Sequence, residues 1–241
     1  MTRTRRAAFA AAALVVTACL VALGVWQLER RAWKHDLIAA VDTRIHADPL
    51  AAPGPPEWSG IDAGKDAYRR ITVTGTFRHD REALVKAVTE RGGGFWVMTP
   101  LETSGFTVLV NRGFVPPEGR DQATRQAGNP AGPVRVTGLL RITEPEGGFL
   151  RSNDPVADRW YSRDVIAIAR ARGAGAVAPY FIDADATANA GGFPVGGLTV
   201  VRFSDNHMVY ALTWFGLALL TLFFAWRLWR PAPLRSNEAD E

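Results

Sequence analysis

The chain has 241 residues, with 28 Lys or Arg against 24 Asp or Glu and a net charge of +4. It contains no dense basic stripe with interleaved aromatic residues, so we expect no nucleic-acid partner. The single cysteine, Cys19, and the three methionines exclude an internal disulfide, a thiolate metal site and a copper carrier built on sulfur ligands.

Two uncharged apolar runs, Ala7 to Leu28 and Met208 to Trp226, lie near the two ends of the chain. At about 1.5 Å per residue, each run is long enough as a helix to cross a bilayer. Arginines flank their outer ends: Arg3, Arg5, Arg6, Arg227, Arg230 and Arg235. Such clusters stay in the cytoplasm, and the sequence between the runs far exceeds the roughly 60-residue loops that this rule governs. We therefore expect a multi-pass protein of the cell (plasma) membrane, with both termini cytoplasmic and an extracytoplasmic centre.

The first run has two alternative interpretations. A basic start followed by an apolar stretch also describes a cleavable secretory signal, and Val16-Thr17-Ala18-Cys19 resembles a lipoprotein processing site. The apolar sequence continues past Cys19 to Trp26, which is too long for a signal core. The length therefore favours a retained anchor.

Apolar residues from Trp33 to Ile45 recur at three- and four-residue spacing, which predicts that the first helix continues as an amphipathic segment. Four prolines between Pro49 and Pro56 then indicate a stiff linker. The expected organisation is a cytoplasmic N-terminus (1–6), a transmembrane helix (7–28), a membrane-proximal amphipathic helix (29–48), a linker (49–67), an extracytoplasmic domain (68–206), a second transmembrane helix (207–226) and a cytoplasmic tail (227–241).

The central domain reads mainly as strands. Runs of β-forming residues cover 71–77, 84–88, 95–101, 106–110, 134–142 and 198–203, with a hairpin turn at 102–105. One short helix is expected from Val165 to Arg172, capped by Asp164 and stopped by Gly173. The segment from Pro116 to Pro133 is expected to be a surface loop and a candidate for disorder. The pattern predicts an α+β fold in which two transmembrane helices flank a largely antiparallel sheet or barrel.

Catalytic motifs are missing from this sequence. It has no nucleophile elbow, phosphate-binding loop, dinucleotide fingerprint or zinc-protease motif, so we expect no enzyme. The histidines His35, His46, His79 and His207 do not fall at metal-ligand spacing. Asp154, Asp158 and Asp164 are close in sequence, yet loop and cap roles are favoured over a paired-carboxylate site.

The residues where the two long helices leave the apolar runs form the candidate site. The two helices should emerge on the same face, and His207, Tyr210 and Trp214 share one side of the second. An imidazole, nearby cations and aromatic rings suit haem, with His207 as the iron ligand and the cations facing propionates. The candidate cofactor-binding residues are His207, Tyr210, Trp214, Trp26, Gln27, Arg30 and Lys34. An ordinary interfacial aromatic belt with snorkelling cations explains the same residues, and taken alone they favour it.

A series of motifs in a fixed order carries a family resemblance from about Gly24 to about Ala218. They are Gly24-Val25-Trp26-Gln27-Leu28-Glu29-Arg30 with Lys34, Tyr68-Arg69-Arg70-Ile71 with Gly75, Gly94-Phe95-Trp96-Val97 with Thr99-Pro100-Leu101, Val108 to Pro116, Val136-Thr137-Gly138 with Arg141, Asn153 with Trp160-Tyr161, Pro179-Tyr180-Phe181-Ile182-Asp183, Pro194 with Gly196-Gly197, and Asn206 to Phe215. In these motifs the chain resembles bacterial members of the surfeit-locus family of cytochrome c oxidase assembly factors.

The resemblance implies a non-enzymatic role in maturing a haem-copper oxidase, through delivery or insertion of haem a into its largest subunit. It places the haem-ligating histidine on His207. It implies the oxidase subunit, the haem a synthesis machinery and membrane lipid as partners, and leaves the oligomeric state open. Asp205 stands where the family commonly has asparagine, and would add a negative charge near the propionates. Met208 likewise replaces a usual leucine.

Two other hypotheses stay open beside haem handling. The chain would act as a scaffold that stabilises an oxidase intermediate without cofactor, or as a membrane-anchored enzyme, which the missing motifs disfavour. Among the remaining motif residues, Trp160 and Tyr161 are expected in the core. For Arg112, a structural hydrogen-bonding role is favoured over contact with a partner or cofactor.

Overall fold

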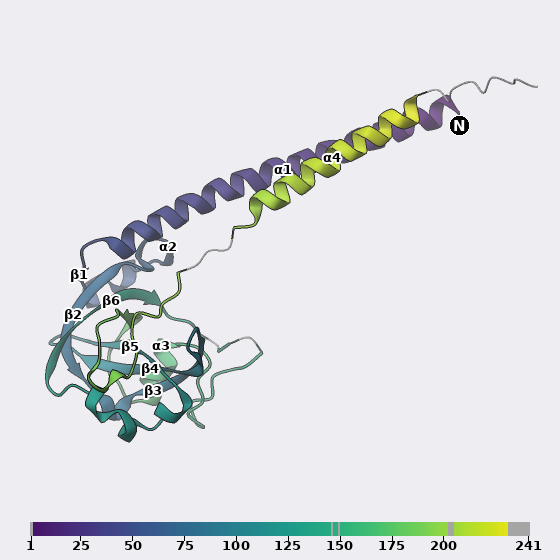
Figure 1. The fold of residues 1–241 in the computed structure, drawn as a ribbon. Helices are drawn as coiled ribbons and strands as arrows, with labels where there is room; N and C mark the ends of the chain where they lie inside the picture. Colours follow the sequence, from purple (N-terminus) through teal and green to yellow (C-terminus); the bar gives the residue numbers. More distant parts are fainter. Residues whose placement is uncertain (1, 146, 149, 202–204, 231–241) are drawn as a thin grey trace, which may run out of the picture. The chain divides into compact units, whose positions relative to one another are not determined.

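A computed structural model describes residues 2–145, 147–148, 150–201 and 205–230. They fall into two compact units (Figure 1). The helical unit comprises the chain up to Ala39 together with the chain after Val201, and the barrel unit comprises Ala40–Val201. This division agrees with the expected separation of the apolar ends from a central strand-rich domain.

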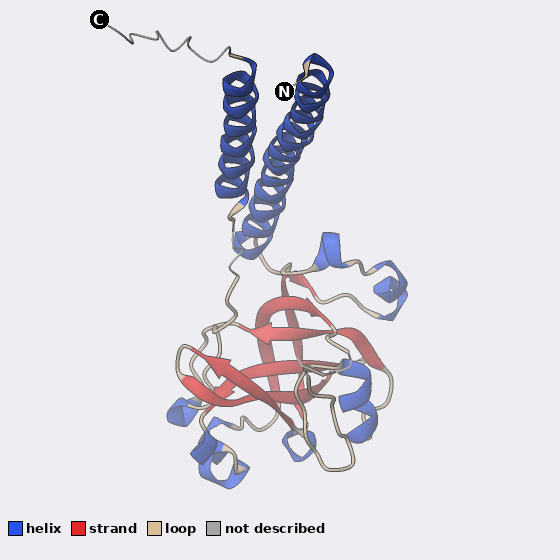
Figure 2. Ribbon diagram, turned by 90° about the vertical axis from the view of Figure 1, so that its right-hand side faces the viewer, coloured by secondary structure: helices blue, strands red, loops and turns tan. Residues whose placement is uncertain are grey.

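The helical unit is built from α1 (Arg3–His46), whose last residues belong to the barrel unit, and α4 (His207–Trp229). Both are long and apolar enough to cross a membrane, which fits a membrane protein. α1 continues without interruption past the apolar run, as its spacing predicted. Inside the helical unit, α1 and α4 run side by side in opposite directions (Figures 1 and 2).

The barrel unit contains one seven-stranded sheet with the order β1-β2-β6-β7-β5-β4-β3. The strands are β1 (Leu50–Ala51), β2 (Arg70–Phe77), β3 (Ala83–Thr89), β4 (Gly92–Glu102), β5 (Thr107–Val115), β6 (Pro133–Ile142) and β7 (Val177–Ala184). An additional pairing of β2 with β4 closes β2, β6, β7, β5 and β4 into a ring (Figure 2). β1–β2 and β5–β7 are parallel and the other pairs are antiparallel, so the predicted α+β class with a largely antiparallel barrel is confirmed.

The barrel unit also contains short helices. They are the α-helices α2 (Ala63–Asp66) and α3 (Val165–Ala171) and the 3-10 helices η1 (Pro55–Gly60), η2 (His79–Arg81), η3 (Pro117–Gly119), η4 (Gln122–Gly128) and η5 (Ala190–Gly192). α3 begins at the predicted residue and ends one residue earlier than predicted, at Ala171. The Asp164 carboxylate accepts from the backbone N–H of Ala167, and Gly173 has a φ of 60°.

Alternation along the strands produces two apolar cores. One fills the ring and includes Ile71, Val110, Val136, Leu140, Tyr180 and Ile182. The other lies between the sheet and α3 and includes Val85, Met98, Leu109, Trp160, Ile168 and Phe181. Trp160 is therefore a core residue as expected, whereas Tyr161 is only half-buried.

Three sequence-based expectations differ from the structure. The segment 49–67 is not a plain linker, because it carries β1, η1 and α2 and packs Trp58 against the ring core. The strand expected over 198–203 is absent from 198–201, and its remainder lies outside the described residues. The expectation of disorder between Pro116 and Pro133 is wrong, since this segment forms η3 and η4 and buries Arg125 against Glu82.

Candidate functional site

The first residue of α4 makes a polar contact with α1. His207 Nδ1 lies 2.7 Å from Gln27 Oε1. An amide oxygen only accepts hydrogen bonds, so the neutral imidazole that fits this contact carries its proton on Nδ1 and its lone pair on Nε2. A neutral imidazole held through one nitrogen presents the other to a metal, which is how metal-ligating histidines are usually oriented.

Asp205, two residues before His207, connects the same two segments. Its carboxylate accepts from the His207 backbone N–H at 3.1 Å, lies 2.8 Å from His35 Nε2 and lies 3.5 Å from Arg31 Nε. The hydrogen bond with His35, together with the nearby charges of His35 and Arg31, lowers the pKa of Asp205. Asp205 is thus paired with His35 and Arg31 of α1, so the negative charge expected at this position has partners within the same group of residues.

A cavity of about 200 Å³ lies at this junction. It is lined by Gln27, Lys34, Asn206, His207 and Tyr210. The structure therefore gathers four of the seven predicted residues, namely Gln27, Lys34, His207 and Tyr210, around one small space.

The other predicted residues lie outside that lining. The Arg30 guanidinium stacks on the Trp33 ring at 3.9 Å, and the Trp26 side chain is largely exposed. Trp214 is half-buried, and its Nε1 is buried without a hydrogen-bond partner among the described residues. The stacking of Arg30 on Trp33 and the exposure of Trp26 are typical of an interfacial aromatic belt, so this part of the pattern favours the belt interpretation.

Sequence reasoning missed the role of Arg31 and His35. Gln27, Arg31 and His35 recur every four residues on α1, so they share one face and are positioned to meet the start of α4. That spacing can be recognised in the sequence. Their partner Asp205 could not be identified from the sequence, because it lies 170 positions away from His35.

Arg112 belongs to the barrel unit and is almost completely buried. Its guanidinium donates to Gly128 O and, at 2.8 Å, to Asn129 Oδ1. These bonds tie β5 to η4 and the residue after it, so the structural hydrogen-bonding role favoured for Arg112 is confirmed.

Comparisons with known proteins agree with the motif pattern. The model of the SURF1 family matches residues 14–219. Surfeit locus protein 1 of Mus musculus is 37% identical over 227 residues, covering 87% of this chain and 72% of the relative. The Homo sapiens protein of that name is 36% identical over 228 residues, covering 87% of this chain and 74% of its own length. The Takifugu rubripes protein is 34% identical over 229 residues, covering 87% and 92%. A family match over most of the chain, with relatives above 30% identity over 72% or more of their own lengths, shows that this chain belongs to the SURF1 family.

Proposed function

We propose that the chain assists the assembly of a haem-copper cytochrome c oxidase by holding haem a and aiding its insertion into the largest oxidase subunit. Membership of the SURF1 family supports a role in oxidase assembly. The observation that carries the haem proposal is the contact between Gln27 Oε1 and His207 Nδ1, which leaves the His207 Nε2 lone pair available.

The side chains around this junction fit a haem. Iron, when bound, would take His207 Nε2 as an axial ligand. Gln27 fixes the tautomer and the ring orientation, and makes the imidazole a better donor. Lys34 lines the same cavity, and Arg30 lies on the neighbouring turn of α1, so both supply positive charge for propionates. The exposed rings of Tyr210 and Trp26 supply an apolar surface for the macrocycle.

Asp205 has a positioning role in this proposal. By binding His35 and Arg31 while capping the backbone of His207, its carboxylate ties the start of α4 to α1. The contacts of the Asp205 carboxylate, together with apolar packing between the helices, then keep Gln27 close to His207.

We propose that the site stands at the outer face of the cell membrane, with both termini in the cytoplasm. The helices α1 and α4 supply the two spans, and the arginines beyond the apolar runs set the orientation. In this arrangement the partners are the largest oxidase subunit and the machinery that makes haem a, with lipid around the helices.

A scaffold that stabilises an oxidase intermediate without cofactor is the second candidate. The stacking of Arg30 on Trp33 and the exposure of Trp26 favour it, because both are features of a lipid-interface belt with no cofactor role. The two candidates differ in one measurable quantity, the haem content of the purified protein.

The test is the Soret absorption of the protein purified in mild detergent from cells that make haem a. We expect absorption in the wild type, its loss in His207→Ala, and its retention in the matched variant His46→Ala, whose histidine is exposed at the end of α1. Gln27→Leu should weaken haem binding by about 10–100-fold, the usual effect of losing the partner of a ligating histidine, and Gln27→Glu should restore it.

A folded His207→Ala protein with unchanged absorption would remove His207 from the site. A wild type without absorption, purified from such cells, would favour the scaffold. Circular dichroism of each variant establishes that the fold is intact.

A further inference from the structure

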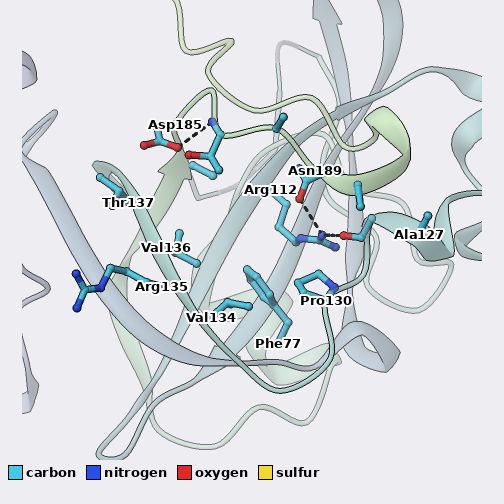
Figure 3. A pocket seen from close by; sticks show the side chains of 15 residues that line it. Phe77, Arg112, Ala127, Pro130, Val134, Arg135, Val136, Thr137, Asp185 and Asn189 are labelled. Carbon is cyan, nitrogen blue, oxygen red and sulfur yellow. Dashed lines mark hydrogen bonds between the residues drawn. The ribbon is translucent and has the colours of Figure 1, made fainter.

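One mouth of the closed barrel is hollow. β7 pairs with β6 only as far as Gly138 and Ala184, so residues 133–137 of β6 continue beyond the end of β7. A cavity of about 340 Å³ lies beyond that point, and it is surrounded by β6, the segment 184–190 and the end of η4 (Figure 3). Barrel mouths and cavities of this size are common positions for small-molecule sites.

Arg112 provides the buried charge in this cavity, whose lining also includes Arg135, with a guanidinium that points away from Arg112 (Figure 3). Arg112 is 2% exposed, lines the cavity and points between Asn189 and Pro130 (Figure 3). Its terminal nitrogens contact neutral acceptors: Gly128 O, Asn129 Oδ1 at 2.8 Å, His79 Nδ1 at 3.3 Å and Asn189 Oδ1 at 3.4 Å. Its Nε–H donates to none of the described residues.

Within the described part of the chain, no carboxylate forms an ion pair with this guanidinium. The nearby acid Glu82 is already paired with Arg125. Burial without a counter-ion lowers the pKa of Arg112 to about 10, so the side chain is still a cation at neutral pH. A buried cation surrounded by neutral dipoles gains strongly from an anion that reaches it.

The remaining lining is largely apolar. Phe77 packs beneath the Arg112 guanidinium, with 4.9 Å from the guanidinium carbon to the ring centre, and Val134 and Val136 of β6 continue this wall (Figure 3). The exposed residues Ala127, Ala188 and Ala190 form a small-residue rim. Asp185 also lines the cavity, and its carboxylate accepts from the Thr187 backbone N–H at 3.0 Å.

We propose that the barrel mouth binds a small amphipathic carboxylate, with its carboxylate on Arg112 and its apolar body along Phe77, Val134 and Val136. The carboxylate would take the Nε–H and one Nη2–H of Arg112 side by side, the paired geometry that guanidinium groups offer. In this arrangement the carboxylate would replace the 3.4 Å contact of Nη2 with Asn189, the longest hydrogen bond that Arg112 makes. The site lies in the barrel unit, so this proposal does not depend on haem binding by His207.

The experiment is calorimetric titration of the full chain in mild detergent with sodium hexanoate, and with hexanamide as an uncharged probe of the same shape. We expect hexanoate to bind at least about tenfold more tightly, as charge-assisted hydrogen bonds require. In Ala188→Trp, where the new ring fills the mouth, hexanoate affinity should fall at least about tenfold. The matched variant Ala157→Trp, at an exposed position away from the cavity, should bind like wild type.

Arg112→Met tests the charge itself. If this variant folds, it should lose the preference for hexanoate over hexanamide. If it does not fold, Ala188→Trp still decides, because that change leaves Arg112 in place. Equal affinities for the two probes in wild type, or hexanoate binding that Ala188→Trp leaves unchanged, would overturn the proposal. The Soret absorption of Ala188→Trp should equal that of wild type, which separates this site from the haem proposal.

Discussion

At the candidate site, polar side chains form hydrogen bonds and ion pairs between segments that are far apart in sequence. Gln27 and His207 are 180 positions apart, and Asp205 joins His35 and Arg31 to the same junction. Each of these residues alone has an ordinary explanation, such as a snorkelling cation or a helix cap. The structure changes that explanation by giving each residue a partner of complementary charge or hydrogen-bonding type.

His79 belongs to a second such group of polar contacts, in the barrel unit. Its ring lies 3.1 Å from Pro130 O through Nε2 and 3.3 Å from Arg112 Nη1 through Nδ1. Since guanidinium only donates, Nδ1 must accept, and the neutral tautomer protonated on Nε2 satisfies both contacts. Burial is the largest cause that lowers the pKa of His79, and the positive charge of Arg112 lowers it further against the opposing Pro130 bond.

We predict that His79 makes the barrel less stable in mild acid. Its folded pKa lies below the value of about 6.5 that an unfolded chain has, so below that pH the unfolded state binds more protons. Stability should therefore fall as pH drops from about 6.5 through the folded pKa. Melting temperatures of the full chain at pH 7.5 and 5.5 measure this, and His79→Gln should show a smaller difference between them.

The control for this prediction is His46→Gln, because His46 lies exposed at the end of α1. It should keep the wild-type difference between the two pH values. A wild-type difference that His79→Gln leaves intact would show that other groups carry the pH dependence.

At the scale of elements, α1 and α4 pack through small residues. Thr17 and Gly24 of α1 are buried, as are Ala211 and Ala218 of α4, and within each helix the two are seven positions apart. This spacing keeps small residues on one face over two turns, as in closely packed membrane helices. Gly24 gives the closest approach, since a Cβ there would lie 2.5 Å from Cε1 of Phe215.

We predict that Gly24→Leu separates the two helices. The added side chain meets the Phe215 ring, and overpacking of this kind costs roughly 1–3 kcal/mol. The variant should melt at a lower temperature in detergent and should bind less haem, because the contact between Gln27 and His207 is only three residues away. The matched control is Gly216→Leu on α4, where a Cβ would meet nothing within 4 Å.

A Gly24→Leu protein as stable as Gly216→Leu would show that α1 and α4 do not depend on this contact. Loss of haem without loss of stability would instead locate the effect at the site itself.

The elements that the sequence revealed are those with an uninterrupted local pattern. The two long helices, α3 with its cap, and the strands β2 to β6 all follow from apolar spacing and turn residues. β7 was missed because Pro179 interrupts its run, and prolines are rare inside paired strands. In the structure Pro179 falls where the pairing of β7 with β5 shifts register, between Val177 and Phe181.

At the scale of the whole chain, the missing information was long-range pairing. The strand order brings β6 and β7 between β2 and β5, so two sheet pairings, β2 with β6 and β5 with β7, join strands that are not neighbours in sequence. Local alternation predicts strands but not their partners. The candidate haem site could be predicted from the sequence, because two helices that cross the same membrane bring their outer ends together. The cavity at Arg112 could not, because it forms only when the strands close into a ring.

The expected membrane orientation remains to be measured, and the chain is suited to a labelling test. Cys19 is the only cysteine, so Cys19→Ser gives a background without thiols. Val156 of the barrel unit is 99% exposed, and Thr2 precedes α1 and is exposed.

In that background we predict that Val156→Cys reacts with a membrane-impermeant maleimide in intact cells, and that Thr2→Cys reacts only after the membrane is broken. The reason is that arginines flanking both apolar runs favour a cytoplasmic position for the two termini. The opposite labelling pattern would place the barrel unit in the cytoplasm and His207 at the inner face, which contradicts the proposed position of the site. A wild-type chain shortened to begin at Cys19 or later would instead show that the first run is a processed signal, and α1 could then no longer present Gln27 to His207 from within a membrane.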